Sequence, residues 1–306
     1  MSKFPELKLG LVGLDTSHVI VFSDEFNNPG AKHHIEGARV VAAFPGGSPD
    51  LPSSIDRVPG YTKDLREKYG VQIMDSIEAV VAASDAILHT SLDGRTHVAQ
   101  FRRIAAAGPG KPVFVDKPFA LSTAEAKEIF AIAQQHGCPI FTSSSLRFTG
   151  ALTRVVTPET RPTVRGAQFH GPATFEKTNP GFYWYGIHPI EMLYTAMGPG
   201  CRSVRCVGLE NHDSIVGVWD GGRIGTVQTN RTGNYAYLGL VHFEKTSAVI
   251  NVQAETKGFF TCLAEVILEF FRTGVPPVSA AETIELIRFI EAANESRAHG
   301  GREVPL

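Results

Sequence analysis

Two residues in the sequence are placed where a side chain could move a proton, and the first is Lys117. It directly follows the apolar run 112–116 and precedes Pro118, which restricts the residue before it to extended backbone. A lysine at the end of a buried strand can hydrogen-bond a substrate hydroxyl, or carry a proton once burial lowers its pKa. The same pattern also fits an exposed lysine that pairs with Asp116.

The second candidate is His188, which stands directly before Pro189 at the start of a helix predicted over 189–197. The positive end of a helix disfavours the imidazolium form, so a neutral ring is expected near pH 7. A neutral imidazole can accept a proton as a general base does, although a capping or packing histidine would leave the same pattern. The other histidines, including the adjacent His33 and His34, lack the spacing of metal ligands, and no metal site is expected.

The sequence GLVGLDTSH lies where a dinucleotide-binding unit would carry the pattern G-x-G-x-x-G. Gly13 occupies the first glycine position, whereas Asp15 and His18 replace the second and third. Thr16 and Ser17 offer hydroxyl and backbone N–H groups at the start of the following helix, where anions bind. The turn therefore predicts either an altered phosphate site or a simple helix cap supplied by Asp15, Thr16 or Ser17.

The end of the next strand is a second test of dinucleotide binding, because NAD sites usually carry an acid there for the ribose hydroxyls. The strand predicted to end at Phe44 is followed by Pro-Gly-Gly-Ser-Pro, and no acid stands at that place. Such an uncharged loop could admit the 2′-phosphate of NADP, with Arg57 available as its partner. It could equally be a loop that binds nothing.

These residues need a framework to position them, and the first half of the chain alternates strand and helix signals. The predicted strands cover 9–13, 39–44, 86–91, 113–116 and 139–143. Two short helices are predicted over 62–69 and 77–83, and two longer ones over 97–107 and 123–136. Such alternation predicts an α/β fold with a doubly wound parallel sheet of the Rossmann type. Ligands of this fold bind beyond the carboxyl ends of the strands.

After about residue 147 the pattern changes to successive strands joined by short turns. The predicted strands cover 164–170, 203–208, 215–219, 223–229, 235–243 and 248–252, with helices at 189–197, 259–273 and 280–297. We therefore expect a Rossmann domain over 1–147 and an α+β domain over 148–306, whose open sheet is a mainly antiparallel meander. The proline-containing segment 155–165 is the expected connector.

Composition excludes several classes of partner. The chain has 306 residues, of which 43% are hydrophobic and 20% charged, and its net charge of −2 argues against nucleic acid. No apolar run reaches the roughly 20 residues that span a bilayer, and the start MSKFPELKLG has no apolar signal region. The four cysteines lack C-x-x-C spacing. These features predict a cytoplasmic protein with free thiols.

The chain also resembles, over essentially its whole length, the Gfo/Idh/MocA family of glucose–fructose oxidoreductase, inositol dehydrogenase and MocA. Four stretches carry the resemblance, namely KLGLVG, VFVDKP with the following LSTAEAK, GIH with Glu191 three residues on, and the run from Glu265 to the end. It implies hydride transfer between NAD or NADP and a carbon of a sugar, polyol or related small molecule. It also implies that Lys117 holds the substrate oxygen while His188 takes the hydroxyl proton.

Further site residues follow from the same resemblance. The expected cofactor contacts are Gly13, Asp15, Thr16, Ser17, His18, Thr90, Ser91 and Lys117, with NADP slightly favoured over NAD by the missing acid. Trp184 stands where the family often has Asp, and with Tyr183 and Tyr185 it could stack on the apolar face of a sugar. Arg147 is a candidate substrate or cofactor contact, and the second sheet is an expected interface of a homo-oligomer.

Two other functions stay open at this point. The altered glycine pattern and Trp184 also fit a catalytically silent family member that binds a small ligand or a partner protein. A lyase or hydrolase that uses a tightly held NAD as a transient oxidant is a third alternative.

Overall fold

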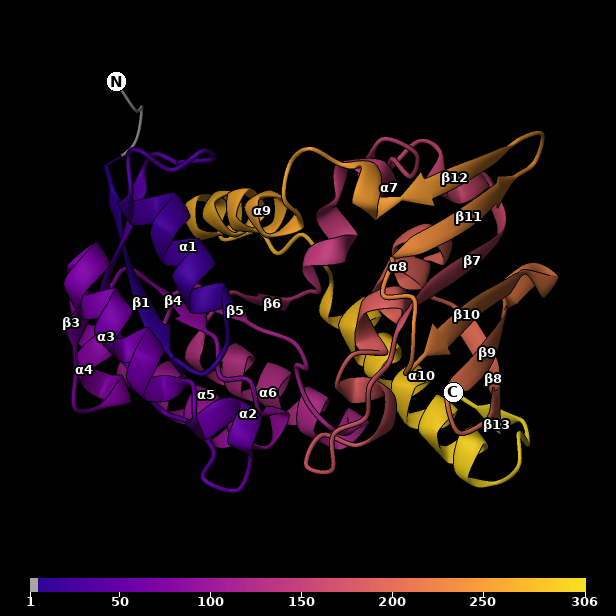
Figure 1. Cartoon of the computed structure of the whole chain (residues 1–306), viewed down its shortest axis with the longest axis horizontal. Helices are drawn as coiled ribbons and strands as arrows, with labels where there is room; N and C mark the ends of the chain where they lie inside the picture. The colour runs from indigo at the N-terminus through magenta and orange to yellow at the C-terminus, as the bar shows by residue number, and fades with distance from the viewer. Residues whose placement is uncertain (1–4) are drawn as a thin grey trace. The chain divides into compact units, whose positions relative to one another are not determined.

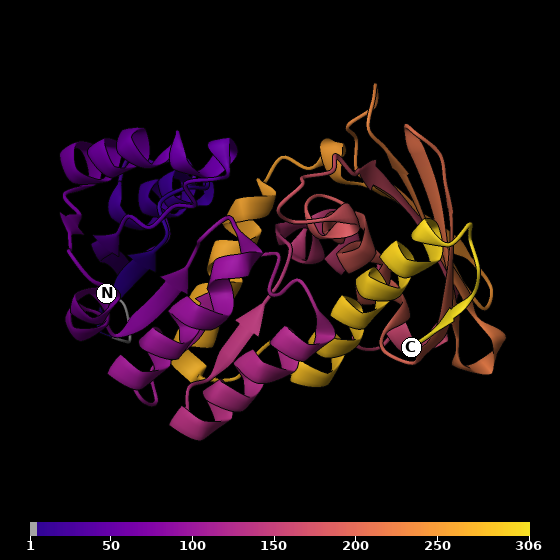
Figure 2. The ribbon, with the colours of Figure 1, turned by 90° about the horizontal axis from the view of Figure 1, so that it is seen from below.

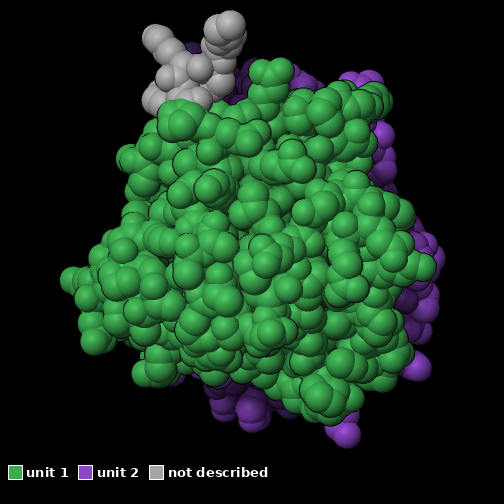
Figure 3. Space-filling model, turned by 90° about the vertical axis from the view of Figure 1, so that its left-hand side faces the viewer, with its two compact units in different colours: residues 1–120, 127–143, 263–279 green, residues 121–126, 144–262, 280–306 purple. Residues whose placement is uncertain are grey.

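The protein was examined as a computed structural model, which describes residues 5–306. Residues 1–4, at the start of the segment expected to lack a signal region, lie outside the described residues. The chain divides into two compact units, shown in separate colours in Figure 3. Unit 1 comprises Met1–Ala120, Lys127–Ser143 and Leu263–Ser279, and unit 2 comprises Leu121–Ala126, Ser144–Cys262 and Ala280–Leu306.

Unit 1 is built on a six-stranded parallel sheet with the order β3-β2-β1-β4-β5-β6 (Figure 1). Its strands are β1 (Leu7–Val12), β2 (Ala38–Phe44), β3 (Gln72–Ile73), β4 (Ala86–His89), β5 (Val113–Val115) and β6 (Ile140–Thr142). Its helices are α1 (His18–Asn27), α2 (Pro52–Ile55), α3 (Val58–Tyr69), α4 (Ile77–Ala83), α5 (His97–Ala107) and most of α6 (Thr123–His136). The helices cover both faces of the sheet (Figure 2), which is why its strands are continuous apolar runs. The expected doubly wound fold is confirmed.

Most of α9 (Phe259–Thr273) also belongs to unit 1, although it follows the second sheet in the sequence. Phe270 of α9 packs edge-to-face on Phe141 of β6, with ring centroids 4.8 Å apart. The helix therefore covers the β6 end of the parallel sheet, so that the core of unit 1 is completed by a segment from late in the chain.

Unit 2 contains a seven-stranded sheet with the order β12-β11-β7-β10-β9-β8-β13. Its strands are β7 (Val164–Pro172), β8 (Cys201–Gly208), β9 (His212–Trp219), β10 (Ile224–Asn230), β11 (Leu238–Phe243), β12 (Ser247–Asn251) and β13 (Val304–Pro305). The sheet is mainly antiparallel, as expected, but it is not a simple meander. Strand β7 enters between β10 and β11 and runs parallel to β10, because helix α8 (Ile187–Met197) crosses over between β7 and β8.

Two helices, α8 and α10 (Ala280–Ala298), pack on one face of the second sheet, and among residues 5–306 no helix covers the other face (Figure 2). The short helix α7 (Gly150–Thr153) lies near the start of unit 2. Along β9 and β10 buried residues alternate with more exposed ones, which is the pattern of a sheet covered on one side. The core of unit 2 therefore lies between the sheet and these two helices.

A local sequence signal explains where helix α6 begins. Ser122 Oγ accepts from the N–H of Glu125 at 3.2 Å, and Glu125 Oε2 accepts from the N–H of Leu121 at 2.9 Å, so these side chains cap the start of α6. All four cysteines are buried free thiols. No helix within residues 5–306 has the length and apolar character that crossing a bilayer requires.

Candidate functional site

The turn after β1 is tight and closely packed. Gly13 has a φ of +94°, and a Cβ placed on it would lie 2.5 Å from the backbone nitrogen of Ser91. The N–H groups of Gly13 and Leu14 donate to the carbonyl oxygens of Phe44 and Pro45, at 3.0 and 2.7 Å. Only glycine fits this position, because both the backbone angle and the neighbouring loop exclude a side chain.

The carboxylate of Asp15 is buried and bonded to protein donors. Its Oδ2 accepts from Ser54 Oγ at 2.6 Å, and its Oδ1 accepts from the N–H of Leu92 at 2.9 Å. Burial raises the pKa of Asp15, and these two hydrogen bonds partly oppose that rise. Asp15 therefore ties the turn after β1 to the loops that follow β2 and β4, and does not cap α1.

The start of α1 keeps its own donors for a ligand. Ser17 is the N-cap residue, but its side chain makes no capping hydrogen bond, and it is exposed. Within residues 5–306, no acceptor pairs with the backbone N–H groups of Thr16 and Ser17. These N–H groups at a helix N-terminus fit the pyrophosphate of a dinucleotide. The expected side-chain cap from Asp15, Thr16 or Ser17 is absent because the Asp15 carboxylate is held elsewhere.

The loop after β2 carries no acid at the position where NAD sites usually have one. Gly46, with a φ of +64°, passes so close to the turn that a Cβ on it would lie 3.4 Å from Gly13 Cα. The nearest acid beyond the loop is Asp50, which accepts from both terminal nitrogens of Arg95 at 2.7 and 2.8 Å. Asp50 is therefore already neutralised by an ion pair.

Thr90 and Ser91 lie directly after β4, beside the turn. Thr90 Oγ1 donates to the carbonyl oxygen of Gly13 at 2.7 Å, and Ser91 Oγ donates to Gln100 Oε1 at 2.6 Å. Both side chains are buried. The structure thus brings the proposed cofactor contacts of unit 1 together at the carboxyl end of the parallel sheet.

Lys117 is at the same edge, directly after β5, with only 8% of its surface exposed. Burial lowers the pKa of the Lys117 ammonium, the neighbouring Asp116 carboxylate opposes this, and the charge of Arg57 adds to the lowering. The alternative of an exposed strand-end lysine is wrong. A buried lysine with a lowered pKa is suited to hold or exchange a proton.

Asp116 and His18 form a buried ion pair next to Lys117, which sequence reasoning did not anticipate. His18 Nδ1 bonds to Asp116 Oδ2, and the other oxygen, Oδ1, accepts from the backbone N–H of Lys117 at 2.8 Å. Burial alone would raise the pKa of Asp116, but the charge and hydrogen bond of His18 bring it below its usual value. The replacement of two glycines, by Asp15 and His18, therefore adds cross-links to this edge of the sheet.

In unit 2, His188 is the second residue of α8, because the helix begins at Ile187 and not at Pro189 as predicted. Its Nδ1 lies 2.7 Å from the hydroxyl oxygen of Ser144. The rings of Tyr185 and Tyr237 stand edge-on to the imidazole, with centroids 5.7 and 5.9 Å away. Ser144 and Tyr237 were missed by sequence reasoning because they are 44 and 49 residues away from His188 in the sequence.

The three aromatic residues before His188 differ in exposure. Tyr183 and Trp184 are 3% and 9% exposed, whereas Tyr185 is 39% exposed. Trp184 and Tyr185 contact each other edge-on, with centroids 6.1 Å apart. Tyr185 is therefore the one of the three that has the surface to stack on a ligand, and the other two support it from the core.

Arg147 is buried among acids. Its Nε donates to Glu191 at 2.5 Å and its Nη1 donates to Glu282 at 2.8 Å. Glu282 also accepts from Arg161 at 2.9 Å. The third nitrogen of Arg147, Nη2, is buried and has no hydrogen-bond partner in the described part of the chain. The network holds the guanidinium in place and leaves one donor for a ligand.

No group of three or more metal-ligating side chains that could hold an ion occurs within residues 5–306. His34 Nδ1 lies 2.9 Å from the carbonyl oxygen of Glu25, so its partner is backbone.

We compared the chain with models of protein families and with curated protein sequences. Residues 32–144 match the model of the Gfo/Idh/MocA group, described as an oxidoreductase family with an NAD-binding Rossmann fold. Over this segment the sequence matches that family, and the fold over the whole length is that of solved dehydrogenases. A search of curated protein sequences finds no match.

Solved structures of several dehydrogenases share the whole architecture. A putative myo-inositol dehydrogenase from Sinorhizobium meliloti superposes with a TM-score of 0.77 at 16% identity, covering 98% of this chain and 99% of that one. Scyllo-inositol dehydrogenase from Lactobacillus casei, with bound NAD(H) and scyllo-inositol, gives 0.79 at 14% identity and covers 98% and 99%. The UDP-N-acetylglucosamine 3-dehydrogenase GnnA from Acidithiobacillus ferrooxidans gives 0.76 at 13%, covering 96% and 99%. At these identities the likeness establishes the fold.

Proposed function

We propose that this Gfo/Idh/MocA-type protein is an NAD(P)-dependent oxidoreductase that transfers a hydride to or from a carbon of a sugar, polyol or related small molecule. The observation that carries the proposal is Lys117, a buried lysine with a lowered pKa at the same sheet edge as the turn after β1. Structurally similar dehydrogenases bind NAD(H) and, in one case, scyllo-inositol, which supports the same ligand classes here.

The residues of the chain take separate roles in this proposal. When bound, the nicotinamide supplies or accepts the hydride. The N–H groups of Thr16 and Ser17 hold the pyrophosphate, with Gly13 allowing its close approach. Lys117 Nζ donates a hydrogen bond to the substrate oxygen, which favours the charge that develops there.

His188 acts as the general base in the oxidative direction. For this it must donate Nδ1–H to Ser144 Oγ, which leaves Nε2 as the proton acceptor. In our proposal Arg147 Nη2 contacts a substrate oxygen, and the half-exposed ring of Tyr185 stacks on the apolar face of a sugar.

NADP is the cofactor we favour slightly over NAD, because the loop after β2 lacks the acid that would repel a 2′-phosphate. Asp15 weakens the binding of either cofactor in this proposal, since its buried carboxylate lies at the turn that would hold the phosphates. Asp15→Asn keeps an oxygen acceptor and removes the charge, so NAD(P)H should bind about threefold to tenfold more tightly.

Titration of the purified protein with NADH and NADPH, followed by fluorescence and thermal unfolding, tests the preference for NADP and the effect of Asp15→Asn. Asp56→Asn, an exposed acid at the end of α2, should leave both affinities unchanged. If neither nucleotide produces a response at millimolar concentration, with or without Asp15→Asn, the dehydrogenase proposal is wrong. That outcome would favour the silent ligand-binding member, for which the buried Asp15 carboxylate is the supporting observation.

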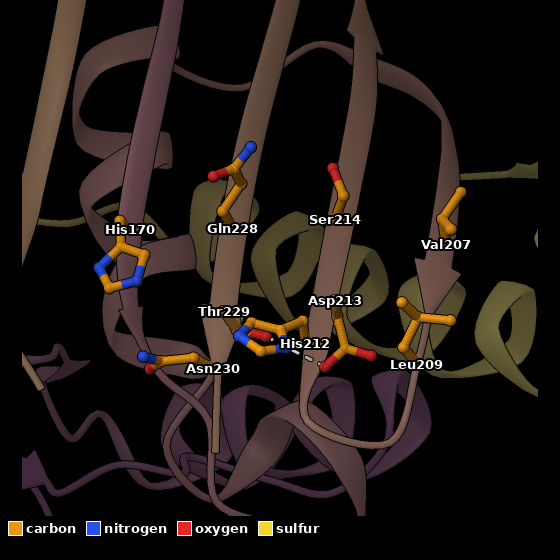
Figure 4. Close-up of a pocket in the computed structure, with 9 residues that line it drawn as sticks. All are labelled: His170, Val207, Leu209, His212, Asp213, Ser214, Gln228, Thr229 and Asn230. Atoms are coloured by element: carbon orange, nitrogen blue, oxygen red, sulfur yellow. Dashed lines mark hydrogen bonds between the residues drawn. The ribbon is translucent and has the colours of Figure 1, made fainter. Parts of the chain in front are cut away.

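We also propose that the open face of the second sheet is an interface between copies of the chain. Two pairs of apolar neighbours lie on this face, Ile224 opposite Val218 and Leu240 opposite Val249, and Ile224 and Val249 are 52% and 72% exposed. Figure 4 shows the side chains that line an adjoining hollow, namely His170, Val207, Leu209, His212, Asp213, Ser214, Gln228, Thr229 and Asn230. The volume of this hollow is about 300 Å³. Exposed apolar surface of this kind marks a contact site.

Light scattering should therefore give the mass of an oligomer, which is two or more times the 33.1 kDa of one chain. Ile224→Lys together with Val249→Lys should convert the protein to a monomer, because two charges would be buried without partners in the interface. Tyr235→Lys, at an exposed residue in a loop of the same unit, serves as the control. A monomeric wild-type protein would contradict the proposal.

A further inference from the structure

The histidine at the third glycine position has no part in the proposed reaction so far. His18 begins α1, and its side chain is buried, with 7% of its surface exposed. It pairs with Asp116, which follows β5, whereas His18 itself follows β1. Strand β4 lies between β1 and β5 in the sheet, so this ion pair spans the carboxyl end of β4.

Asp116 is held on three sides. Its backbone N–H donates to the carbonyl oxygen of His89 at 2.9 Å, which ties it to the end of β4. One carboxylate oxygen bonds to His18, and the other accepts from the backbone N–H of Lys117 at 2.8 Å. A carboxylate engaged in this way has little freedom to turn toward the Lys117 ammonium.

We propose that His18 is a positioning residue for Lys117, because it holds the neighbouring Asp116 carboxylate that would otherwise pair with the lysine ammonium. This inference rests on the proposed function of Lys117 as the group that binds the substrate oxygen. A lysine bound tightly to a carboxylate would be a poor donor to a neutral hydroxyl. By bonding to the Asp116 carboxylate, His18 keeps the ammonium suited to that task.

The charges that act on Lys117 agree with this arrangement. Burial and the charge of Arg57 lower the pKa of the lysine, and the charge of Asp116 raises it, with the lowering prevailing. Arg57 directly precedes α3. If His18 were absent, the full charge of Asp116 would act on Lys117, and the pKa of the ammonium would rise.

The test measures the reactivity of Lys117 without substrate or cofactor. Trace acetic anhydride is added across a range of pH, and acetylation of the peptide that contains Lys117 is read by mass spectrometry, with the exposed Lys127 as internal reference. In His18→Phe, which keeps a ring but removes the charge, acetylation of Lys117 at pH 8 should fall about threefold to tenfold. Adding Asp116→Asn to this variant should restore or exceed the wild-type rate, because the competing carboxylate is gone.

Matched controls separate this role from a structural one. His34→Phe alters a partly buried histidine of the same unit that bonds only to a backbone carbonyl, and it should leave the rate within twofold. His18→Asn keeps an N–H donor without the charge, so it should fall between wild type and His18→Phe, and it serves if the latter does not fold. An unchanged or faster reaction of Lys117 in both His18 variants overturns the proposal.

The result is independent of whether the chain is a dehydrogenase. Failure to bind NADH or NADPH would defeat the proposed function and leave the acetylation result intact. If turnover is found, His18→Phe should lower kcat about tenfold or more at pH 7.

Discussion

Replacement of Lys117 by alanine should reduce turnover about a thousandfold while the affinity for NAD(P)H changes less than about threefold. The reason is that Lys117 Nζ is the donor we assign to the substrate oxygen, where negative charge develops during hydride transfer. Lys117 is also buried, with 8% of its surface exposed, so a lysine on the protein surface cannot reach the position of its ammonium. The measurement is kcat with the first substrate identified, alongside the Kd of the cofactor from fluorescence.

Two further variants sharpen this result. Lys117→Met keeps most of the side-chain volume and removes the charge, so it should be as inactive as the alanine variant. Lys127→Ala, on the exposed side of α6, should keep full activity. Turnover within tenfold of wild type in Lys117→Met would show that the lysine does not hold the reacting oxygen.

The second large effect concerns stability. Arg147→Leu should lower the free energy of unfolding by about 3–5 kcal/mol, because it leaves buried carboxylates without their counter-charge. Arg147 is 6% exposed and bonds to both Glu191 and Glu282, and Glu282 also accepts from Arg161. Denaturant unfolding followed by circular dichroism measures the change.

A matched exposed ion pair provides the comparison. Arg154 bonds to Glu255 at 2.5 and 3.0 Å, but its side chain is 67% exposed, so Arg154→Leu should lower the stability far less than Arg147→Leu does. Glu191→Gln combined with Arg147→Leu should recover part of the lost stability, since one buried charge is removed. Equal effects of Arg147→Leu and Arg154→Leu would show that the buried network contributes no more than a surface pair.

The fold of unit 1 could be predicted from local patterns, because continuous apolar strands that alternate with amphipathic helices have few other ways to bury their surface. The second sheet was predicted less well. Its strands were found, but the insertion of β7 beside β10 depends on the crossover made by α8. The attachment of α9 to unit 1 also depends on packing between Phe270 and Phe141, which are far apart in the sequence.

The candidate site divides in the same way. Positions of Lys117 and His188 at element ends could be predicted, since each stands next to a proline that marks a boundary. The contacts around them could not be predicted. Ser144, which bonds to His188, is 44 residues away from it, and His18 is 98 residues away from Asp116, the neighbour of Lys117. No local pattern reports which side chains two distant loops bring together.

By itself, the sequence determined the alternation of strands and helices, the glycine turn at Gly13 and the residues able to move protons, because these depend on local backbone geometry and periodicity. Only the tertiary structure decided where the Asp15 carboxylate goes. It is held by Ser54 and Leu92, so the start of α1 keeps its N–H groups for an anion. A buried charge takes the donors that folding places around it, and those donors come from distant parts of the chain.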